Sequence, residues 1–270
     1  MLCRRPSAVL RPFIDLVWAT NGVSQAPLGA MRELVLPTGA MHVVLRLGGE
    51  PLRIFADIDE RDGFSVGSSI LGGVRAAPYC KSIADPAPTV GAMLRPGAVE
   101  LLSWAPARVL AGAHTRLEDL WRRADLAELR ERLEATADGE RRLTVLETFF
   151  ARRLPRVRGV HPLVAHALAR FRASFSVTHV VKESGYSHRH LAHTFDEAIG
   201  MTPKIYGRLL RFGRVLDRLN ASPGASLADI AAAEAYADQA HMSRDFKAFA
   251  GVTPGRYRRI APASPRHVPI

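Results

Sequence analysis

The sequence predicts an α+β protein in which a β-rich, barrel-like domain with trailing helices precedes an all-α domain. Short apolar runs separated by Gly and Pro fill the chain up to about residue 83, a pattern typical of strands joined by turns. From Leu117 onward, leucines and aromatic residues recur every three or four positions, which is the period of a helix. Beyond residue 160, helical segments repeat a common pattern of residues. The length of 270 residues also favours two domains.

The strands of the first domain are predicted from runs rich in β-branched and other apolar residues. They span residues 34–36, 41–47, 52–56, 69–71 and 90–94. Gly-Gly and Asp-Gly pairs between them are turn signals, so the strands suit a small barrel or sandwich. Alternating acids without the spacing of a calcium loop indicate a solvated hairpin tip at Asp57, Asp59, Glu60 and Asp62.

The helices that trail this domain run from Leu117 to Leu154. Their apolar side chains lie three or four positions apart with charges between them, so each helix has one apolar face. These faces either form the seam of a dimer or pack on the β-rich part. Two prolines, Pro155 and Pro162, flank the short basic joint 156–159. We therefore place the domain boundary between a domain at 1–155 and a second domain at 156–270.

The net charge of +11 is concentrated in the second domain. Residues 1–155 carry 20 basic and 18 acidic side chains, whereas residues 156–270 carry 17 and 8. A localised basic excess is expected of a polyanion binder, because neutralised phosphates release condensed counterions. A basic surface that is merely solvated would have the same composition.

Composition excludes several classes of protein. No run approaches the roughly 18 uninterrupted apolar residues of a membrane helix, and the segment Met1–Phe13 is not followed by the apolar run of a signal peptide. The two cysteines, Cys3 and Cys80, fit neither a disulfide framework nor a cysteine-rich zinc site. We expect a soluble, cytoplasmic protein without a membrane partner.

The second domain contains an internal repeat. Residues 191–208 match residues 242–259 at an offset of 51, so that Phe195 corresponds to Phe246 and Tyr206 to Tyr257. Further upstream the offset is 50, because one residue is inserted in the turn of the second copy. So many ordered matches indicate a duplicated structural unit.

Each copy is predicted to be a helix, a tight turn and a second helix. Ser187 can cap the second helix of the first copy, and Ser226 can cap the first helix of the second copy. Two short helices joined by such a turn form the helix-turn-helix, which places its second helix in the major groove of DNA. Between the copies, residues 205–220 form one longer helix that could hold the two units at a fixed separation, for successive major grooves about 34 Å apart.

These motifs resemble the AraC/XylS family of bacterial transcriptional regulators over roughly residues 160–260. The resemblance is carried by 185–191 (GYSHRHL), 200–203 (GMTP), 238–247 (DQAHMSRDFK) and 251–258 (GVTPGRYR). It implies a tandem helix-turn-helix domain that binds double-stranded promoter DNA asymmetrically, with RNA polymerase as a further candidate partner. Two positions depart from the family, because Ala235 replaces its usual Gly in the second turn and Met242 its usual Phe.

The first domain resembles, more loosely, an uncharacterised domain that precedes this module in many regulators. The likeness lies in residues 36–39 (LPTG), 41–47 and 90–98. It implies a sensory or dimerising domain, and hence an unidentified small-molecule effector or a homodimer. His42 lies in a predicted strand of this domain, and Arg95 lies in a predicted turn. Arg95 either points into the barrel and holds an anionic ligand or, as we favour, braces the turn.

The resemblance carries over a set of DNA-binding residues. Groove-facing positions are Arg189, Ala192 and His193 in the first unit, and Gln239, Ala240, His241 and Arg244 in the second. Arg can contact guanine, Gln adenine and Ala a thymine methyl group. The alternative for Arg189 and Arg244 is a phosphate clamp that positions without reading sequence. Phosphate contacts near helix ends are expected from Lys204, Arg208, Arg256 and Arg258.

No enzymatic or metal chemistry is predicted. The chain has no nucleophile elbow, phosphate loop or paired carboxylates. His188, His190 and His193 crowd one segment, but no carboxylate or cysteine completes a metal site, so we predict neither metal nor cofactor. Two alternative functions are a nonspecific architectural DNA-binding protein and an enzyme-like barrel with accessory DNA binding. Equal affinity for random and promoter DNA would favour the first, and turnover of a small molecule would favour the second.

Overall fold

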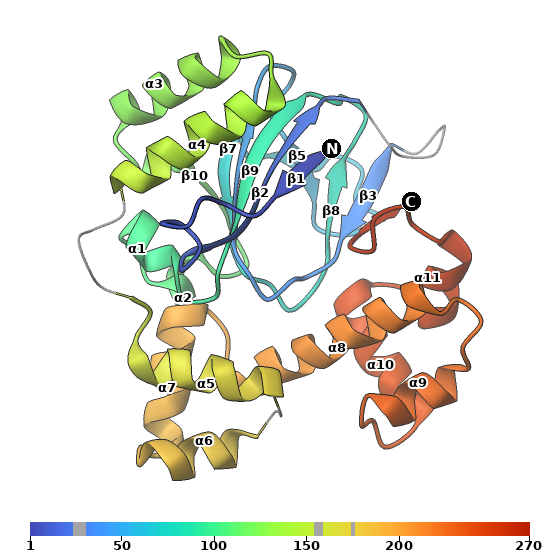
Figure 1. The fold of residues 1–270 in the computed structure, drawn as a ribbon. Coiled ribbons are helices and arrows are strands. Elements are labelled where there is room, and N and C mark those ends of the chain that lie inside the picture. Colours follow the sequence, from blue (N-terminus) through green and yellow to red (C-terminus); the bar gives the residue numbers. More distant parts are fainter. Residues whose placement is uncertain (24–30, 154–158, 174–175) are drawn as a thin grey trace.

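The computed structural model describes the chain except residues 24–30, 154–158 and 174–175 (Figure 1). Its first domain holds two antiparallel sheets. The six-stranded sheet has the order β1 (Leu2–Arg4), β2 (Ile14–Asn21), β9 (Pro88–Leu94), β4 (His42–Arg46), β7 (Ser69–Gly72) and β10 (His114–Arg116). The five-stranded sheet has the order β11 (His267–Pro269), β3 (Arg32–Val35), β8 (Tyr79–Ser82), β5 (Arg53–Phe55) and β6 (Phe64–Ser65).

The α+β class and the β-rich first domain are confirmed. Within the described residues, strands of one sheet are not hydrogen-bonded to strands of the other, so the barrel-like domain is not a closed barrel. Each predicted strand segment overlaps a strand of the structure. The acids 57–62 lie in the connection between the paired strands β5 and β6, as predicted for a hairpin tip.

Side chains alternate between two apolar layers along strand β4. Val43 and Leu45 belong to the main core, whereas Val44 packs with a smaller cluster of Ile54, Val66 and Ile70 between the sheets. His42 lies two residues before Val44 and therefore shares its face, toward the five-stranded sheet. The first sheet thus has one apolar face and one face that mixes apolar with polar side chains.

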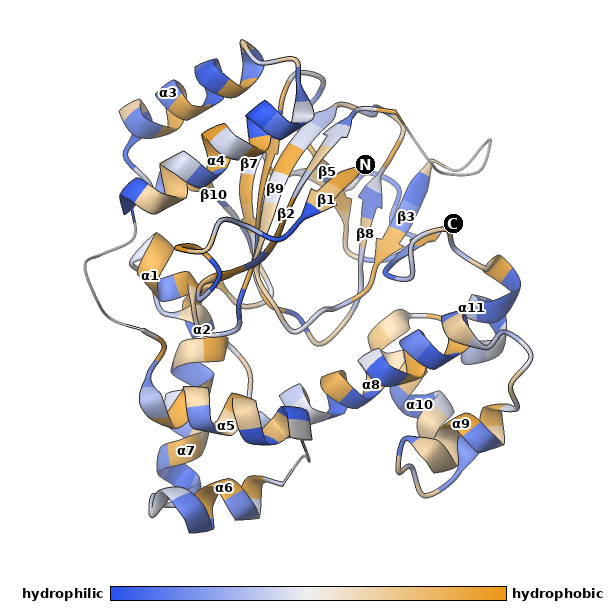
Figure 2. Ribbon diagram, in the orientation of Figure 1, coloured by the Kyte–Doolittle hydropathy of each residue, from blue (hydrophilic) through white to orange (hydrophobic). Residues whose placement is uncertain are grey.

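Helices cover the apolar face of the six-stranded sheet (Figure 2). The helix α4 (Gly139–Arg153) lies on the sheet, with α3 (Arg123–Glu134) beside it. They are preceded in the chain by α1 (Val99–Ser103), α2 (Ala107–Leu110) and the short 3-10 helix Leu117–Asp119. Trp121 packs its ring 5.1 Å from that of Phe149 and donates a 2.9 Å hydrogen bond to the Leu102 carbonyl. Because α4 lies against β2 and β9, its apolar face packs on the sheet, which is the second of the two predicted alternatives.

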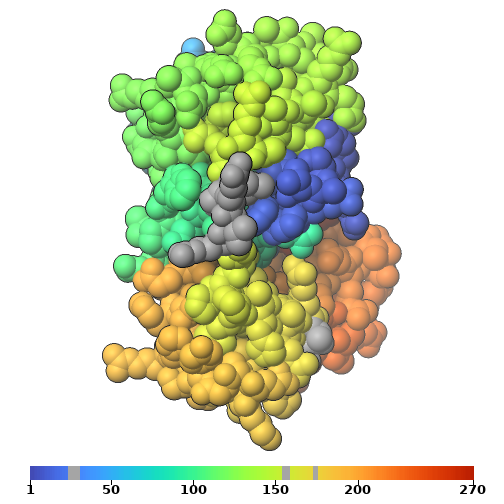
Figure 3. Space-filling model, turned by 60° about the vertical axis from the view of Figure 1, so that its left-hand side comes forward, coloured from blue at the N-terminus to red at the C-terminus, as the bar shows by residue number. Residues whose placement is uncertain are grey.

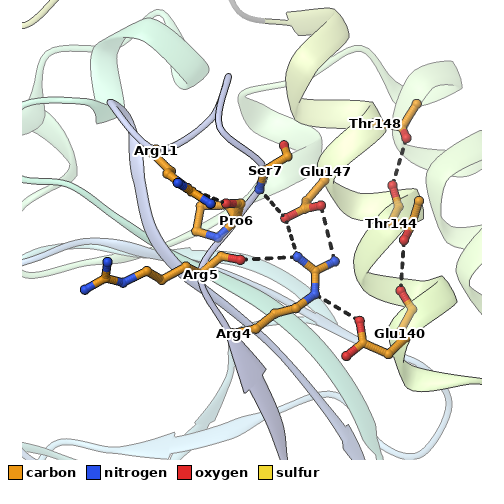
Figure 4. A network of polar contacts seen from close by, with 9 residues as sticks. All are labelled: Arg4, Arg5, Pro6, Ser7, Arg11, Glu140, Thr144, Glu147 and Thr148. Atoms are coloured by element: carbon orange, nitrogen blue, oxygen red, sulfur yellow. Dashed lines mark hydrogen bonds and ion pairs between the residues drawn. The ribbon is translucent and has the colours of Figure 1, made fainter.

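An ion-pair network ties α4 to the N-terminal strand (Figure 4). The Arg4 guanidinium donates to both carboxylate oxygens of Glu147, at 2.9 and 3.3 Å, and to Glu140 at 2.9 Å. The Ser7 amide donates to the same Glu147 carboxylate at 3.0 Å. The hydrogen bond to Glu147 raises the pKa of Arg4. A carboxylate that is almost fully buried is therefore paired, as buried charges must be.

The second domain is helical. It contains α5 (Pro162–Ala173), α6 (Val177–Ser184), α7 (His188–Ile199), α8 (Pro203–Ala221), α9 (Leu227–Ala233), α10 (Gln239–Ala250) and α11 (Pro254–Ile260). Helix α8 crosses the molecule, with α5–α7 at one end and α9–α11 at the other (Figure 1). The predicted boundary between 155 and 156 falls outside the described residues. None of the helices described is long and apolar enough to cross a membrane.

The chain returns to the first domain after α11. Strand β11 pairs antiparallel with β3, so that His267, Val268 and Pro269 lie opposite Val35, Leu34 and Glu33. Val268 is fully buried. His267 Nδ1 lies 2.7 Å from the Glu33 carboxylate, and the Arg266 guanidinium donates to the Pro37 carbonyl at 2.6 Å. A segment of the helical domain thus completes an edge of the first domain's sheet.

The first domain also packs against both ends of the helical domain. In Figure 3 the first domain lies above the helical domain and in contact with it. Gly200 and Gly251, which end α7 and α10, are corresponding residues of the repeat. A Cβ at Gly200 would lie 2.8 Å from the Ala107 carbonyl oxygen, and one at Gly251 would lie 3.3 Å from Pro78. Arg108 of α2 forms an ion pair with Glu197 of α7. Both repeated units therefore contact the first domain at equivalent points.

Candidate nucleic-acid interface

Side-chain caps start the second helix of each unit. The Ser187 hydroxyl accepts a 3.2 Å hydrogen bond from the His190 amide, and the Asp238 carboxylate accepts one of 2.6 Å from the His241 amide. These caps satisfy amides that a helix leaves without a partner in its first turn. The repeat thus begins α7 and α10 at equivalent positions.

The turn before each of these helices needs a left-handed backbone. Gly185 adopts φ +73° in the first unit, and Ala235 adopts φ +54° in the second. Glycine takes this conformation without strain, whereas a Cβ makes it costly. Alanine in place of the family's usual glycine therefore keeps the turn conformation, but its backbone is strained there.

The Gly-x-Thr-Pro motif ends one helix and starts the next. Gly200 and Gly251 have φ +82° and +72°, and the hydroxyls of Thr202 and Thr253 cap α8 and α11. Proline follows each cap as the first helical residue, where its missing N–H costs nothing. Behind each motif an aromatic pair closes the unit, Phe195 with Tyr206 at 5.4 Å and Phe246 with Tyr257 at 5.6 Å.

Most predicted groove-facing side chains lie on the open faces of α7 and α10. Exposed residues are Arg189, His193, Gln239, Ala240 and Arg244, whereas Ala192 and His241 are half-buried. His241 packs its ring edge against Tyr236 at 5.2 Å. The caps and the buried side of each helix fix its axis, so each helix presents its predicted residues on one face.

The predicted phosphate contacts divide into two pairs. Lys204 and Arg256 are exposed near the starts of α8 and α11. Arg208 instead donates to the Asp245 carboxylate at 2.7 Å, and Arg258 donates to the Ala225 carbonyl at 2.8 Å. The last two arginines therefore have partners within the protein, and a phosphate would have to share or replace those partners.

Two buried carboxylates hold the second unit on α8. Asp245 of α10 faces Arg208 and Arg211, at 2.7 and 3.7 Å. Glu234, at the end of α9, is 5% exposed and accepts hydrogen bonds from Arg214, at 2.6 Å, and from Arg218. The charges of four arginines on α8 are thus partly neutralised inside the domain. The ion pairs with Asp245 also orient α10 relative to α8.

Sequence reasoning missed this role and one further residue. The acids Glu234 and Asp245 stand where the first copy has Ser184 and Thr194, so the repeat alone gives no signal for them. Tyr186 is 48% exposed and stacks on His190 at 4.6 Å, whereas its counterpart Tyr236 is buried beneath the Arg211 guanidinium. A comparison of the two copies could have marked Tyr186 as an exposed aromatic residue beside α7.

The histidines of α7 are not gathered around a common point. Among the residues that the structure describes, no group of three or more His, Cys, Asp or Glu side chains could hold a metal ion. Cys3 and Cys80 are free thiols. Arg95 donates to the Arg11 carbonyl at 2.6 Å and pairs with Asp15, which is the turn-bracing role that we favoured.

Comparison with known families agrees with this geometry. Residues 164–260 match the model of a helix-turn-helix domain of the AraC type. The chain carries an AraC-type DNA-binding domain and is a transcription regulator. Residues 4–116 of the regulator match a domain of unknown function (DUF6597). The chain is a DNA-binding protein, and the one matched family of known function is not a catalytic one.

The regulator is similar to several solved structures, and no curated protein matches it. The C-terminal domain of AraT, a response regulator from Geobacillus stearothermophilus, is 22% identical, covering 37% of this chain and 85% of that chain with a TM-score of 0.35. ToxT from Vibrio cholerae O395 is 12% identical over 92% and 97% of the two chains, with a TM-score of 0.47. Wild-type ToxT from Vibrio cholerae strain SCE256, bound to an unsaturated fatty acid, is 11% identical over 90% and 93%, with a TM-score of 0.43.

Proposed function

We propose that the regulator reads promoter DNA with α7 and α10 in successive major grooves. The observation that carries this proposal is the placement of two capped helices, each with an exposed arginine, at opposite ends of α8 (Figure 1). Helix α8 has 19 residues, which at 1.5 Å per residue gives a length of about 28 Å. This length suits recognition helices that enter grooves about 34 Å apart.

In this proposal Arg189 and Arg244 contact base edges, together with the other groove-facing residues of their helices. Both arginines are exposed, and neither has an ion-pair partner among the described residues. Lys204 and Arg256 contact phosphates from exposed positions at helix starts, where backbone amides also favour anions. Arg208 and Arg258 assist only if DNA draws them from Asp245 and from the Ala225 carbonyl.

We also propose that residues 1–155 form the controlling domain and residues 156–270 the DNA-binding domain. The first domain contacts both units at Gly200 and Gly251, and strand β11 ties it to the end of α11. A ligand or a second copy of the chain that shifts this domain would change how α7 and α10 are placed relative to each other. Such control requires only different affinities of the ligand for the two arrangements.

Binding to single-base variants of an operator tests the DNA proposal. The operator is first selected from genomic fragments, and the wild type is compared with Arg189→Ala, Arg244→Ala and Arg256→Ala. Loss of a base contact should cost about 1–3 kcal/mol at one or two base pairs, and the two affected sites should lie about one helical turn apart. Arg256→Ala is the matched control, because loss of a phosphate contact weakens all sequences alike and lowers the salt slope by about 1.

Two outcomes would contradict this proposal. A uniform loss across all variants for Arg244→Ala would make that arginine a phosphate clamp. Equal affinity of the wild type for random and selected DNA would favour an architectural DNA-binding protein instead.

A further inference from the structure

Tyr186 is an exposed aromatic side chain at the start of a recognition helix. It lies in the turn between α6 and α7, directly before Ser187, which caps α7. The side chain is 48% exposed, and among the described residues of the helical domain no other large apolar side chain is as open to solvent. Tyrosine suits an interface, because its ring is apolar and its hydroxyl can donate a hydrogen bond.

The Tyr186 ring is held in place although it is exposed. It stacks on the ring of His190, with the two centroids 4.6 Å apart and an angle of 19° between the planes. Nε2 of His190 in turn lies 3.5 Å from the hydroxyl of Thr194. These three side chains are four positions apart, so they form a row along one side of α7. The tyrosine is therefore oriented before any partner binds, which lowers the entropy lost on binding.

The second unit contains the same two residues in a closed arrangement. Tyr236 and His241 are the counterparts of Tyr186 and His190 in the repeat. Their rings pack edge to face, with centroids 5.2 Å apart. Tyr236 is only 7% exposed, and the Arg211 guanidinium lies 4.1 Å from the centre of its ring. The second unit thus presents no tyrosine to a partner.

One difference between the copies accounts for the open tyrosine. The Asp245 carboxylate pairs with Arg208 and Arg211 and so draws Arg211 over the Tyr236 ring. Thr194 occupies the position of Asp245 in α7 and has no charge with which to attract an arginine. In the described part of the chain, no arginine or lysine lies over the Tyr186 ring.

The stacked pair lies on the flank of α7. Successive residues of a helix are about 100° apart around its axis, so His190 is about 100° from Arg189 and about 60° from His193, which are predicted to face the groove. Leu191, on the far side, is fully buried. A helix with its side chains is about 10–12 Å across and fills a major groove about 12 Å wide. Side chains on its flank therefore face the sugar-phosphate backbone and not the base edges.

We propose that Tyr186 is a further DNA contact of the first unit, whose hydroxyl donates a hydrogen bond to a phosphate oxygen of the strand beside α7. His190 is a positioning residue that holds the tyrosine ring by stacking. The inference rests on the proposed entry of α7 into a major groove. Tyrosine is among the side chains that contact phosphates and fix the register of a protein on DNA. Because Tyr236 is buried, the two units hold the DNA backbone differently.

Ethylation interference with the full chain tests the phosphate contact. The selected operator is ethylated at single phosphates, and bound and free fragments are compared. Tyr186→Phe keeps the stacked ring and removes only the hydroxyl. It should bind about tenfold more weakly, equivalent to about 1.4 kcal/mol and near the lower end for a hydrogen bond to a charged group. One phosphate at which ethylation weakens the wild type should no longer matter to this variant.

Tyr236→Phe is the matched control, because it removes the corresponding buried hydroxyl. It should keep the affinity and the interference pattern of the wild type. The loss in Tyr186→Phe should be equal for all single-base variants of the operator. The salt slope should stay unchanged, because the lost group is neutral, whereas Arg256→Ala should lower the slope by about 1. Wild-type affinity of Tyr186→Phe, an unchanged interference pattern, or a loss confined to one or two base pairs would overturn the proposal.

The positioning role of His190 has its own readout. His190→Ala should weaken operator binding in the otherwise wild-type chain and have no further effect in Tyr186→Phe. His190→Phe retains a flat ring for the stack and should retain the affinity. Additive losses of His190→Ala and Tyr186→Phe, or a loss in His190→Phe, would show that His190 does not act through the tyrosine.

This inference and the proposed base reading can fail separately. If Arg189→Ala loses affinity at one or two base pairs while Tyr186→Phe binds as the wild type does, base reading stands and the tyrosine contact is wrong. If Tyr186→Phe loses its phosphate while Arg189→Ala weakens all sequences alike, the tyrosine contact stands and base reading by Arg189 is wrong.

Discussion

The strained turn of the second unit offers a direct test of how the repeat is built. Ala235 adopts φ +54°, where the corresponding Gly185 of the first unit adopts +73°. Replacing Ala235 with Gly removes a steric cost of about 1–2 kcal/mol. It also restores chain entropy to the unfolded state, which costs about 0.4–1 kcal/mol. Ala235→Gly should therefore stabilise the protein by about 0.5–1 kcal/mol.

Little else changes at this position. The Ala235 side chain is exposed, so no buried methyl group is lost. Its amide donates to the Ala232 carbonyl at 3.2 Å, and its carbonyl accepts from Arg211 at 3.3 Å, and glycine retains both hydrogen bonds. The predicted gain thus comes from the backbone alone.

Gly185→Ala is the matched reverse experiment. A Cβ at Gly185 would meet no atom within 4 Å, so its only cost is the left-handed backbone. We expect a loss of about 0.5–1 kcal/mol, equal in size to the gain at position 235. Urea denaturation followed by circular dichroism measures both, and the two melting temperatures should move in opposite directions by about 1–3 °C. Destabilisation by Ala235→Gly, or a neutral Gly185→Ala, would refute the argument from φ.

Two further changes test the buried charges. Glu234→Gln should lower the free energy of unfolding, measured by urea denaturation, by about 1–3 kcal/mol, a value reduced because the partner arginines are half-exposed. The control Asp229→Asn, at an exposed position of α9, should lower it by less than about 1 kcal/mol. Equal losses for the two variants would contradict the role of the buried carboxylate. The free energy of unfolding should also fall as the pH drops from 6.5 toward 3. Burial lowers the folded-state pKa values of His42 and His114 to about 4 and about 3, below the usual value near 6.5, so the unfolded chain binds more protons than the folded protein in this range. Each histidine contributes up to about 1.4 kcal/mol per pH unit to the slope of the free energy of unfolding against pH in that window. His42→Asn should therefore flatten this slope, and His188→Asn, at an exposed position, should not. A slope that His42→Asn leaves unchanged would be evidence against the buried, neutral imidazole.

Sequence predicted the elements whose cause is local. The offset of 51 located both units, because caps, turns and the Gly-x-Thr-Pro motif depend on residues close in the chain. The apolar runs predict the strands at 41–47 and 90–94, and the resemblance marks Ala235 as the residue that replaces a usual glycine in the second turn. Strand β2 was missed, although its short apolar run over residues 16–19 is typical of a strand.

Features that join distant residues could not be predicted in this way. Strand β11 has three residues and pairs with a strand more than two hundred positions earlier, so no local pattern marks it. The pairing of Glu234 with Arg214 and Arg218 depends on how α9 packs on α8. The burial of Tyr236 and the exposure of Tyr186 likewise depend on where the arginines of α8 lie. The groove-facing residues Arg189 and Arg244 remain predictions, supported by their exposure.

The pairing of β11 with β3 has a consequence for how the protein is made. The side of β3 that receives β11 has no partner within the first domain, because its other neighbour is β8. About 230 residues must be synthesised after β3 before His267 is available, which at 5–20 residues per second takes roughly 10–50 s. During that time the nascent chain exposes an unpaired sheet edge, the kind of surface that promotes aggregation. A ribosome-associated chaperone should therefore engage this domain until α11 has emerged and carried β11 to the edge of the sheet.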